Sequence, residues 1–138
     1  FYNHFHDKYQ LITWIFKEDA YSGMSKNHTE NWQDIMTNVF TSINQRRSFY
    51  QHAFSMRVQN SLQDYLRESD RLLYLNLYQQ LTNNLPLTED MNFALSFYSS
   101  GCFEATFNWL KSNNPYSPQE HARRIWIAMP YILRKALT

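Results

Sequence analysis

The sequence is poor in the residues that form tight turns. Its 138 residues include only two glycines and four prolines, whereas average usage of about 7% Gly would supply several times as many glycines. Because β-hairpin turns depend on glycine, this scarcity argues against an all-β protein. The apolar fraction of 43% still suffices for the buried core of a single soluble domain or a little more.

Cysteine and long apolar runs are also scarce. Cys102 is the only cysteine, which excludes an intrachain disulfide and a thiolate zinc site and favours a reducing compartment. The longest apolar run, residues 125–133, is interrupted by Pro130 and reaches about half of the ~20 residues that span a bilayer. Residues 1–5 show no charged segment or small-residue cleavage site of a signal peptide. We therefore expect a cytoplasmic protein without a membrane segment.

The chain also has almost no excess of positive over negative charge, while aromatic residues are abundant. The formal net charge of +1 excludes a strongly basic nucleic-acid binder, although it does not exclude a chain that lacks a neighbouring basic segment. Aromatic residues make up 17% of the chain and include ten tyrosines. Tyrosine suits surfaces that are amphipathic until a partner packs on them, so a partner surface is expected.

Apolar residues recur at helical spacing along most of the chain, which predicts an all-α helical bundle. The wide apolar stripe of the third long helix indicates a central position in the bundle. The expected helices cover residues 7–21, a stretch from a cap at Thr29 or Asn31 that breaks near 45–48 and resumes through Phe54, then 60–81, 88–112 and 117–136.

Start signals support the last two helices. Thr88 precedes two acidic residues, and Ser117 precedes a proline and a glutamate, as helix caps commonly do. The helix at 88–112 is apolar on two faces and has Gly101 in its middle, which predicts contacts on opposite sides and a close approach at this glycine. Pro130 is expected to bend the final helix.

Side chains with catalytic or metal-binding potential are few. His4 and His6 form a His-x-His pair, but residues two apart on a helix point to different faces, so no metal site is expected. Cys102 lies in an apolar setting without a neighbouring histidine and is expected to be a buried, inert thiol.

The charged residues Glu68, Asp70 and Arg71 are typical of the solvated face of a helix rather than of an acid–base pair. No phosphate loop, nucleophile elbow or zinc motif is present in the sequence. We therefore expect neither enzymatic activity nor a cofactor.

The first dozen residues carry a more specific pattern. Residues 1–12, FYNHFHDKYQLI, combine an aromatic pair, His-Phe, a lysine three residues later and an apolar pair. This order resembles the segment that closes the helix-turn-helix of TetR/AcrR-family transcriptional regulators. The resemblance implies that Tyr2, His4 and Lys8 contact DNA phosphates, which suits their donor chemistry. The alternative interpretation of the segment is a helix end with an amphipathic aromatic cluster.

The C-terminal half is similar to a TetR subgroup that includes regulators of dihydroxyacetone-kinase operons. The similarity rests on Phe97-Tyr98-Ser99-Ser100-Gly101, on Asn108-Trp109-Leu110-Lys111 and on Tyr116-Ser117-Pro118-Gln119-Glu120. With the N-terminal segment, the resemblance extends over nearly the whole chain. The first two helices of the family and most of its recognition helix are absent from this sequence.

The resemblance implies two regions and a homodimer. Residues 1–21 correspond to the end of the DNA-binding helix-turn-helix domain, and residues 22–138 to the effector-binding and dimerisation domain. The last two helices are expected to form a four-helix bundle with those of a second copy. The expected interface residues are Gly101, Phe103, Phe107, Trp126 and Met129.

The expected function is that of a regulator that binds operator DNA in its full-length form and responds to an effector. The sequence leaves open whether the effector is a small molecule or a protein. A second hypothesis is a helical protein-interaction adaptor without DNA binding. The residues expected to line an effector pocket are Met36, Phe40, Tyr74, Tyr78, Phe97 and Tyr98.

Overall fold

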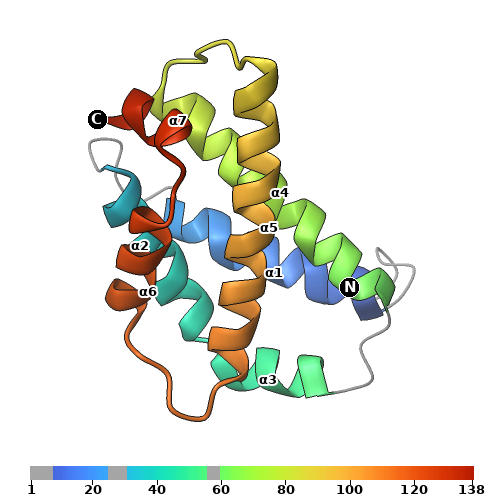
Figure 1. Cartoon of the computed structure of the whole chain (residues 1–138). Coiled ribbons are helices and arrows are strands. Elements are labelled where there is room, and N and C mark those ends of the chain that lie inside the picture. Colours follow the sequence, from blue (N-terminus) through green and yellow to red (C-terminus); the bar gives the residue numbers. More distant parts are fainter. Residues whose placement is uncertain (1–7, 25–30, 56–59) are drawn as a thin grey trace.

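Helices are the only regular secondary structure in the ranges that the computed structural model describes, residues 8–24, 31–55 and 60–138 (Figure 1). The all-α prediction is confirmed. In chain order the helices are α1 (Lys8–Met24), α2 (Trp32–Asn44), α3 (Arg47–Ser55), α4 (Asn60–Leu81), α5 (Glu89–Lys111), α6 (Pro118–Ile127) and the short α7 (Tyr131–Arg134), followed by a 3-10 turn (Lys135–Leu137).

Three helices begin at side-chain caps, as the sequence predicts. The side-chain oxygens of Asn31, Thr88 and Ser117 each accept a hydrogen bond from a backbone N–H three residues later, at 2.9–3.1 Å. Each cap satisfies a donor that the first turn of a helix leaves without an intrahelical partner. Asn31, rather than Thr29, is therefore the cap of α2.

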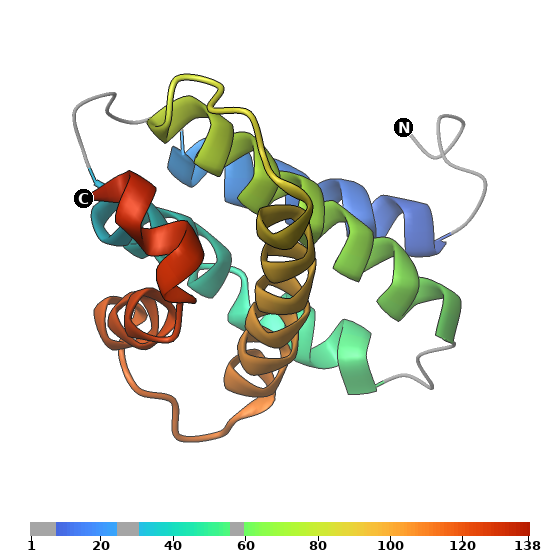
Figure 2. The same ribbon diagram turned by 45° about the horizontal axis from the view of Figure 1, so that its top comes forward.

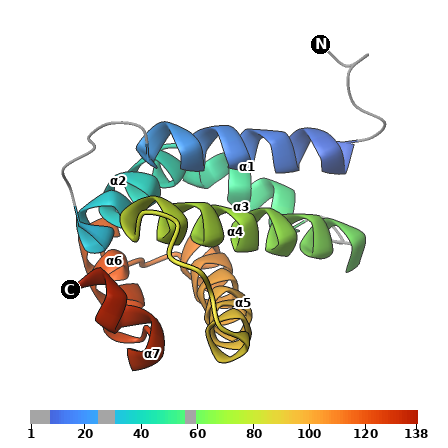
Figure 3. The ribbon, with the colours of Figure 1, turned by 90° about the horizontal axis from the view of Figure 1, so that it is seen from above.

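The helices form a layered bundle. α1 and α4 pack against each other and run side by side, while α5 crosses them (Figures 2 and 3). α2 packs against both α1 and α6, so it connects the N-terminal helix to the C-terminal part of the bundle. The first turn of α1 lies at the far end of the molecule from α7 (Figure 2).

The crossing of α1 and α2 depends on a glycine. A Cβ atom added at Gly23 would lie 2.5 Å from Cα of Val39, well inside van der Waals contact. Gly23 therefore lets the two backbones approach closely, and α1 continues to Met24 instead of ending near residue 21 as predicted.

The C-terminal end of α5 is held by an arginine. Nη1 of Arg47 donates to the carbonyl oxygens of Trp109 at 2.7 Å and Leu110 at 3.0 Å. The guanidinium group also lies 4.7 Å from the centroid of the Trp109 ring. Arg47 thus satisfies carbonyls at the end of α5 with a positive charge, and it fixes α3 to this end of the helix.

The final helix is shorter than predicted. α6 ends at Ile127, and Pro130 has an extended ψ of 140° and begins α7 instead of bending a continuous helix. A proline disfavours helical geometry at the residue before it and has no N–H to bond, so the helix stops ahead of it. The chain then folds back, and the hydroxyl of Tyr78 donates to the carbonyl of Leu133 at 2.9 Å.

Candidate functional site

A cluster of polar groups lies inside the bundle where α2, α4 and α5 meet. We call it the Asp70 cluster; its members are Trp32, Asp70, Tyr74, Tyr98 and Cys102, none more than 5% exposed. The ring centroids of Trp32 and Tyr74 are 5.7 Å apart, and those of Tyr74 and Tyr98 are 5.8 Å apart. The arrangement brings together residues that are 70 positions apart in the sequence.

Three atoms of the Asp70 cluster are buried without a hydrogen-bond partner among the described residues. They are Nε1 of Trp32, Oδ2 of Asp70 and the hydroxyl oxygen of Tyr74. A buried polar group without a partner costs roughly 1–3 kcal/mol of stability. Such groups are uncommon in folded proteins, so the cluster reduces the stability of the bundle.

Burial also changes the acidities of the Asp70 cluster. Desolvation raises the pKa of the Asp70 carboxyl to about 8. Desolvation, and secondarily the charge of Asp70, raises the pKa of the Cys102 thiol to about 12, so the thiol is buried and protonated as the sequence predicts. The prediction that Asp70 lies on a solvated face is wrong, whereas its neighbours Glu68 and Arg71 do form an exposed ion pair at 2.7 Å.

The position of Asp70 follows from helical spacing. Asp70 lies four residues after Leu66 and four residues before Tyr74, and both of these are buried. Residues four apart share one face of a helix, so Asp70 belongs to the inward face of α4. The spacing was a signal for burial that the charge of the side chain concealed.

An apolar pocket of about 460 Å³ lies next to the Asp70 cluster, between α5 and α6. Tyr98 and Cys102 belong to both the pocket and the cluster. The hydroxyl of Tyr98 donates to the carbonyl of Ile125, which ties α5 to α6. The lining residues are Phe97, Tyr98, Gly101, Cys102, Ala105, Tyr116, His121, Arg124, Ile125, Ala128 and Pro130.

His121 is the buried imidazole of this α5–α6 pocket. Its Nε2 lies 2.9 Å from Oγ1 of Thr106, and its Nδ1 lies 2.9 Å from the hydroxyl of Tyr116. The ring stacks on Trp109 with centroids 4.7 Å apart. Burial, with the nearby positive charges of Arg124 and Arg47, lowers the pKa of His121 to about 4, so the ring is neutral at pH 7.

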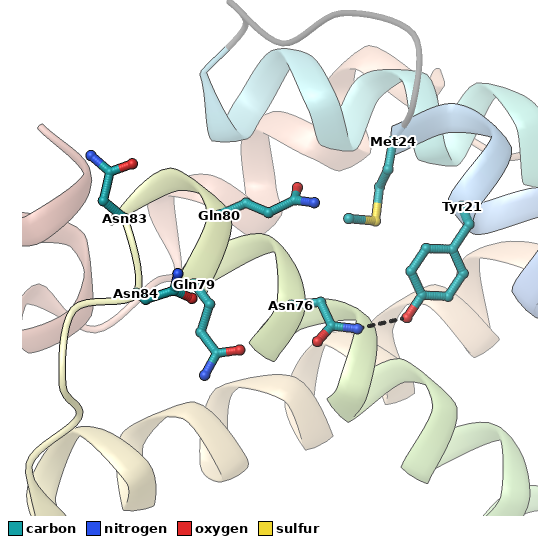
Figure 4. A pocket seen from close by; sticks show the side chains of 7 residues that line it. All are labelled: Tyr21, Met24, Asn76, Gln79, Gln80, Asn83 and Asn84. Atoms are coloured by element: carbon teal, nitrogen blue, oxygen red, sulfur yellow. Dashed lines mark hydrogen bonds between the residues drawn. The ribbon is translucent and has the colours of Figure 1, made fainter.

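A second pocket, of about 530 Å³, lies where α1 and α4 end (Figure 4). Tyr21 and Asn76 point toward one another, and Nδ2 of Asn76 donates to the Tyr21 hydroxyl at 3.1 Å. The other lining residues are Met24, Gln79, Gln80, Asn83 and Asn84. Asn83 and Asn84 have positive φ values of 53° and 58° in the predicted turn, a conformation that asparagine tolerates. The pocket is open, polar and without a charged lining residue.

An exposed aromatic face lies on α5. The side chains of Phe93 and Phe97 are 73% and 71% exposed, and their rings stack with centroids 6.3 Å apart. A groove of about 570 Å³ runs along this face, lined by Phe93, Ser96, Phe97, Ser100 and Gly101. No described atom other than those of its own helix backbone and chain neighbours lies within 4 Å of a Cβ added at Gly101. The close approach predicted at Gly101 is thus not made by the described part of this chain.

The residues predicted to contact DNA fall partly outside the described ranges. Tyr2 and His4 belong to residues 1–7, which are not described. Lys8 is the first residue of α1 and is exposed, with Nζ 5.6 Å from the centroid of the Tyr9 ring. Its contact with DNA stays a prediction.

The predicted effector-pocket residues separate into two groups. Met36, Phe40 and Tyr78 are at most 2% exposed and fill the core of the bundle without lining any pocket described above. Tyr74 belongs to the Asp70 cluster, while Phe97 and Tyr98 line the α5–α6 pocket.

The predicted interface residues lie mostly within the core of the single chain. Phe103 and Phe107 are 4% and 9% exposed, and Phe107 packs on Phe54 of α3 with ring centroids 4.5 Å apart. Met129 is buried and Trp126 is half-buried. Their contact with a second copy stays a prediction, but the exposed large apolar side chains of α5 are Phe93 and Phe97.

Within the described ranges, no group of three or more His, Cys, Asp and Glu side chains is placed to hold a metal ion. None of the described helices is both long and apolar enough to cross a membrane.

Comparison with protein families identifies the family of this chain. A TetR-family model described as the transcriptional regulator C-terminal region matches residues 30–130, well over half of the chain. The chain belongs to the TetR family. Neither the curated proteins nor the solved structures provide a match. The TetR C-terminal region thus begins just before α2 and includes the Asp70 cluster, the α5–α6 pocket and the exposed aromatic face.

Proposed function

We propose that this TetR-family chain is the regulatory and dimerisation part of a homodimeric DNA-binding transcriptional regulator that responds to an effector. The match of residues 30–130 to the TetR C-terminal region carries the proposal. Residues 1–21 would belong to the DNA-binding domain and residues 22–138 to the regulatory domain. The similarity of the C-terminal half to regulators of dihydroxyacetone-kinase operons is part of the same proposal, and so are a non-enzymatic role and a cytoplasmic location.

The exposed aromatic face supports a dimer. Phe93 and Phe97 present apolar rings beside the open position of Gly101, so a helix of a second copy can approach closely there. A stable homodimer of this kind buries on the order of 2,000 Å² or more, with aromatic residues near its centre. α5 and α6 would provide that area together, since Ile127 of α6 is also 55% exposed.

Sedimentation at micromolar concentration tests the dimer. We expect wild-type protein to sediment as a dimer and Phe97→Asp to sediment as a folded monomer, because two charges would enter the apolar contact by symmetry. Tyr65→Asp, at an exposed aromatic residue of α4, is the matched control and should stay dimeric. Phe107→Asp would be uninformative because it places a charge in the core. A monomeric wild-type protein would contradict the proposal.

DNA binding is tested in protein that carries the complete N-terminal DNA-binding region. Replacing Lys8 by alanine should weaken operator binding uniformly and reduce the salt slope by roughly one unit, since a single phosphate contact is lost. Lys17→Ala, at an exposed position farther along α1, is the control and should change neither quantity. An unchanged affinity for Lys8→Ala at every salt concentration would contradict the assignment.

A further inference from the structure

The α5–α6 pocket is bounded by small and apolar side chains. Gly101, Ala105 and Ala128 line it and leave the space between the two helices open. Ile125 and Pro130 add further apolar surface. The volume of about 460 Å³ lies within the range of small-molecule sites, roughly 300–1,000 Å³. The pocket therefore suits a ligand with an apolar body.

The uncharged polar groups of the pocket already have partners within the chain. The hydroxyl of Tyr98 donates to the carbonyl of Ile125. The two ring nitrogens of His121 lie 2.9 Å from the hydroxyl of Tyr116 and 2.9 Å from that of Thr106. A ligand that bonded to any of these groups would have to compete with an internal hydrogen bond, so they offer little to a polar ligand.

Arg124 is the only charged side chain among the described residues that line the pocket. Its guanidinium group lies 4.2 Å from the centroid of the Tyr116 ring, which also lines the pocket, so the positive charge is beside the cavity. Nε of Arg124 donates to Oε2 of Glu120 at 3.0 Å, but Arg123 holds both oxygens of that carboxylate at 2.7 Å. Glu120 thus has two cations for one negative charge, and the Nη atoms of Arg124 keep donors that no described residue uses.

We propose that the α5–α6 pocket binds a small carboxylic acid with an apolar body, whose carboxylate is bound by Arg124. A guanidinium group suits a carboxylate because its parallel N–H groups match the two oxygens. An amine would meet a like charge at Arg124, and no described lining residue carries a carboxylate to receive it. We take this acid to be the effector of the regulator, and in that respect the inference rests on the proposed function.

The pocket also borders the surface proposed for the homodimer. Phe97 and Gly101 line both the pocket and the groove of the exposed aromatic face, so a bound acid would lie next to a second copy. An apolar side chain of that copy is the alternative occupant of the pocket. It would leave the charge of Arg124 unmatched, whereas an acid satisfies both the apolar lining and the charge.

Three probes of one skeleton test the charge requirement: 4-phenylbutyrate, 4-phenylbutanol and 4-phenylbutylamine. Binding is followed by the methyl resonances of Ile125 in the pocket, with buried Ile12 of α1 as the internal reference. We expect the acid to shift Ile125 saturably, with a Kd about tenfold below that of the alcohol, because its hydrogen bonds to Arg124 are charge-assisted. The amine should bind most weakly, and Ile12 should not move.

Two adjacent arginines of α6 provide the decisive comparison. Arg124→Gln removes the charge beside the pocket, so the preference for the acid over the alcohol should fall below twofold. Arg123→Gln removes the same charge from the same ion pair with Glu120, but Arg123 does not line the pocket, so the full preference should remain. Both positions are exposed, and thermal melting checks that each variant is folded.

Filling the pocket tests the apolar part of the site separately. Ala105 is exposed on α5, so Ala105→Leu extends into the space beside α6 without entering the core. We expect it to weaken the acid and the alcohol by similar factors and to keep the ratio of their Kd values, because it removes room and not charge.

The proposal is overturned if the alcohol binds as tightly as the acid, if Arg124→Gln keeps the preference, or if Arg123→Gln loses it to the same extent. It is also overturned if Ile125 responds to protein concentration and not to the acid, since a second copy then fills the pocket. These outcomes do not depend on DNA. A failure of operator binding would refute the proposed regulator while leaving the acid site standing.

Discussion

The hydroxyl of Tyr50 donates a hydrogen bond of 2.6 Å to Oδ2 of Asp19 and so joins α3 to α1 inside the bundle. The second carboxylate oxygen of Asp19 accepts from Nε of Arg46 at 2.9 Å. Both oxygens of a buried aspartate are thus satisfied, in contrast to Asp70. One interior carboxylate joins three side chains of the bundle, and the other keeps an oxygen without a partner among the described residues.

Removing the Tyr50 hydroxyl should destabilise the protein. Tyr50→Phe leaves Oδ2 of Asp19 buried without this donor, which costs about 1–3 kcal/mol of the free energy of unfolding measured in urea. Tyr131→Phe removes a hydroxyl from a side chain that is 71% exposed and should change stability by less than about 0.5 kcal/mol. Equal stabilities of the two variants would show that the Asp19 contact contributes nothing.

The two glycines of the chain should respond to alanine with opposite signs. Gly23→Ala places a Cβ 2.5 Å from backbone Cα of Val39 and should destabilise the protein by about 1–3 kcal/mol. Gly101→Ala meets open space within a helix and should stabilise a single chain by about 0.5–1 kcal/mol.

Chemical unfolding measures both glycine variants, and sedimentation separates the second effect. If a partner helix crosses at Gly101 in the proposed dimer, Gly101→Ala weakens association while it strengthens the helix. Destabilisation by Gly101→Ala in protein held monomeric would contradict the open geometry.

Asp70 should make the protein less stable as the pH rises. Its pKa is raised from 3.8 to about 8 by burial, so between these values the folded protein holds a proton that the unfolded chain has released. The contribution of Asp70 to the free energy of unfolding therefore falls from pH 4 to pH 8. Asp70→Asn should remove this fall and stabilise the protein by roughly 2 kcal/mol at pH 8. Asp64→Asn, at an exposed aspartate of the same helix, is the control.

His121 should have the opposite dependence. Its pKa is lowered from 6.5 to about 4, so the unfolded chain binds a proton in this window that the folded protein does not. Stability should fall by up to about 3 kcal/mol as the pH drops from 6.5 to 4. His121→Gln, which stays neutral, should lose less stability over the same range. Parallel profiles for the two proteins would show that the imidazole is not held neutral.

The sequence predicted the elements of the fold better than the faces they bury. Caps are local, so Thr88 and Ser117 could be identified from their immediate neighbours. The inward direction of Phe103 and Phe107 depends on α3 and α4, which are distant in the sequence, and a helix that is apolar on two sides does not reveal which side a neighbour covers.

The candidate site was harder to predict. Tyr74 and Tyr98 were identified among the aromatic residues, but their charged companion was missed because aspartate next to glutamate and arginine is usually solvated. The spacing from Leu66 to Tyr74 puts Asp70 on the inward face of α4, but the prediction followed its charged neighbours instead, and the packing of the bundle shows that the carboxyl is buried.

The segment that the family model matches and the segment that folds together do not end at the same residue, because the chain folds back onto the core after Pro130. The family match ends at residue 130, yet Leu133 is fully buried and its carbonyl accepts the hydrogen bond from Tyr78. On the other side of the match, Ile12 and Phe16 of α1 belong to the same core. A protein trimmed to residues 30–130 would therefore leave two sides of its interior open to water. The family segment is only part of the cooperatively folded structure, and α1 and the residues after Pro130 are needed to complete its core.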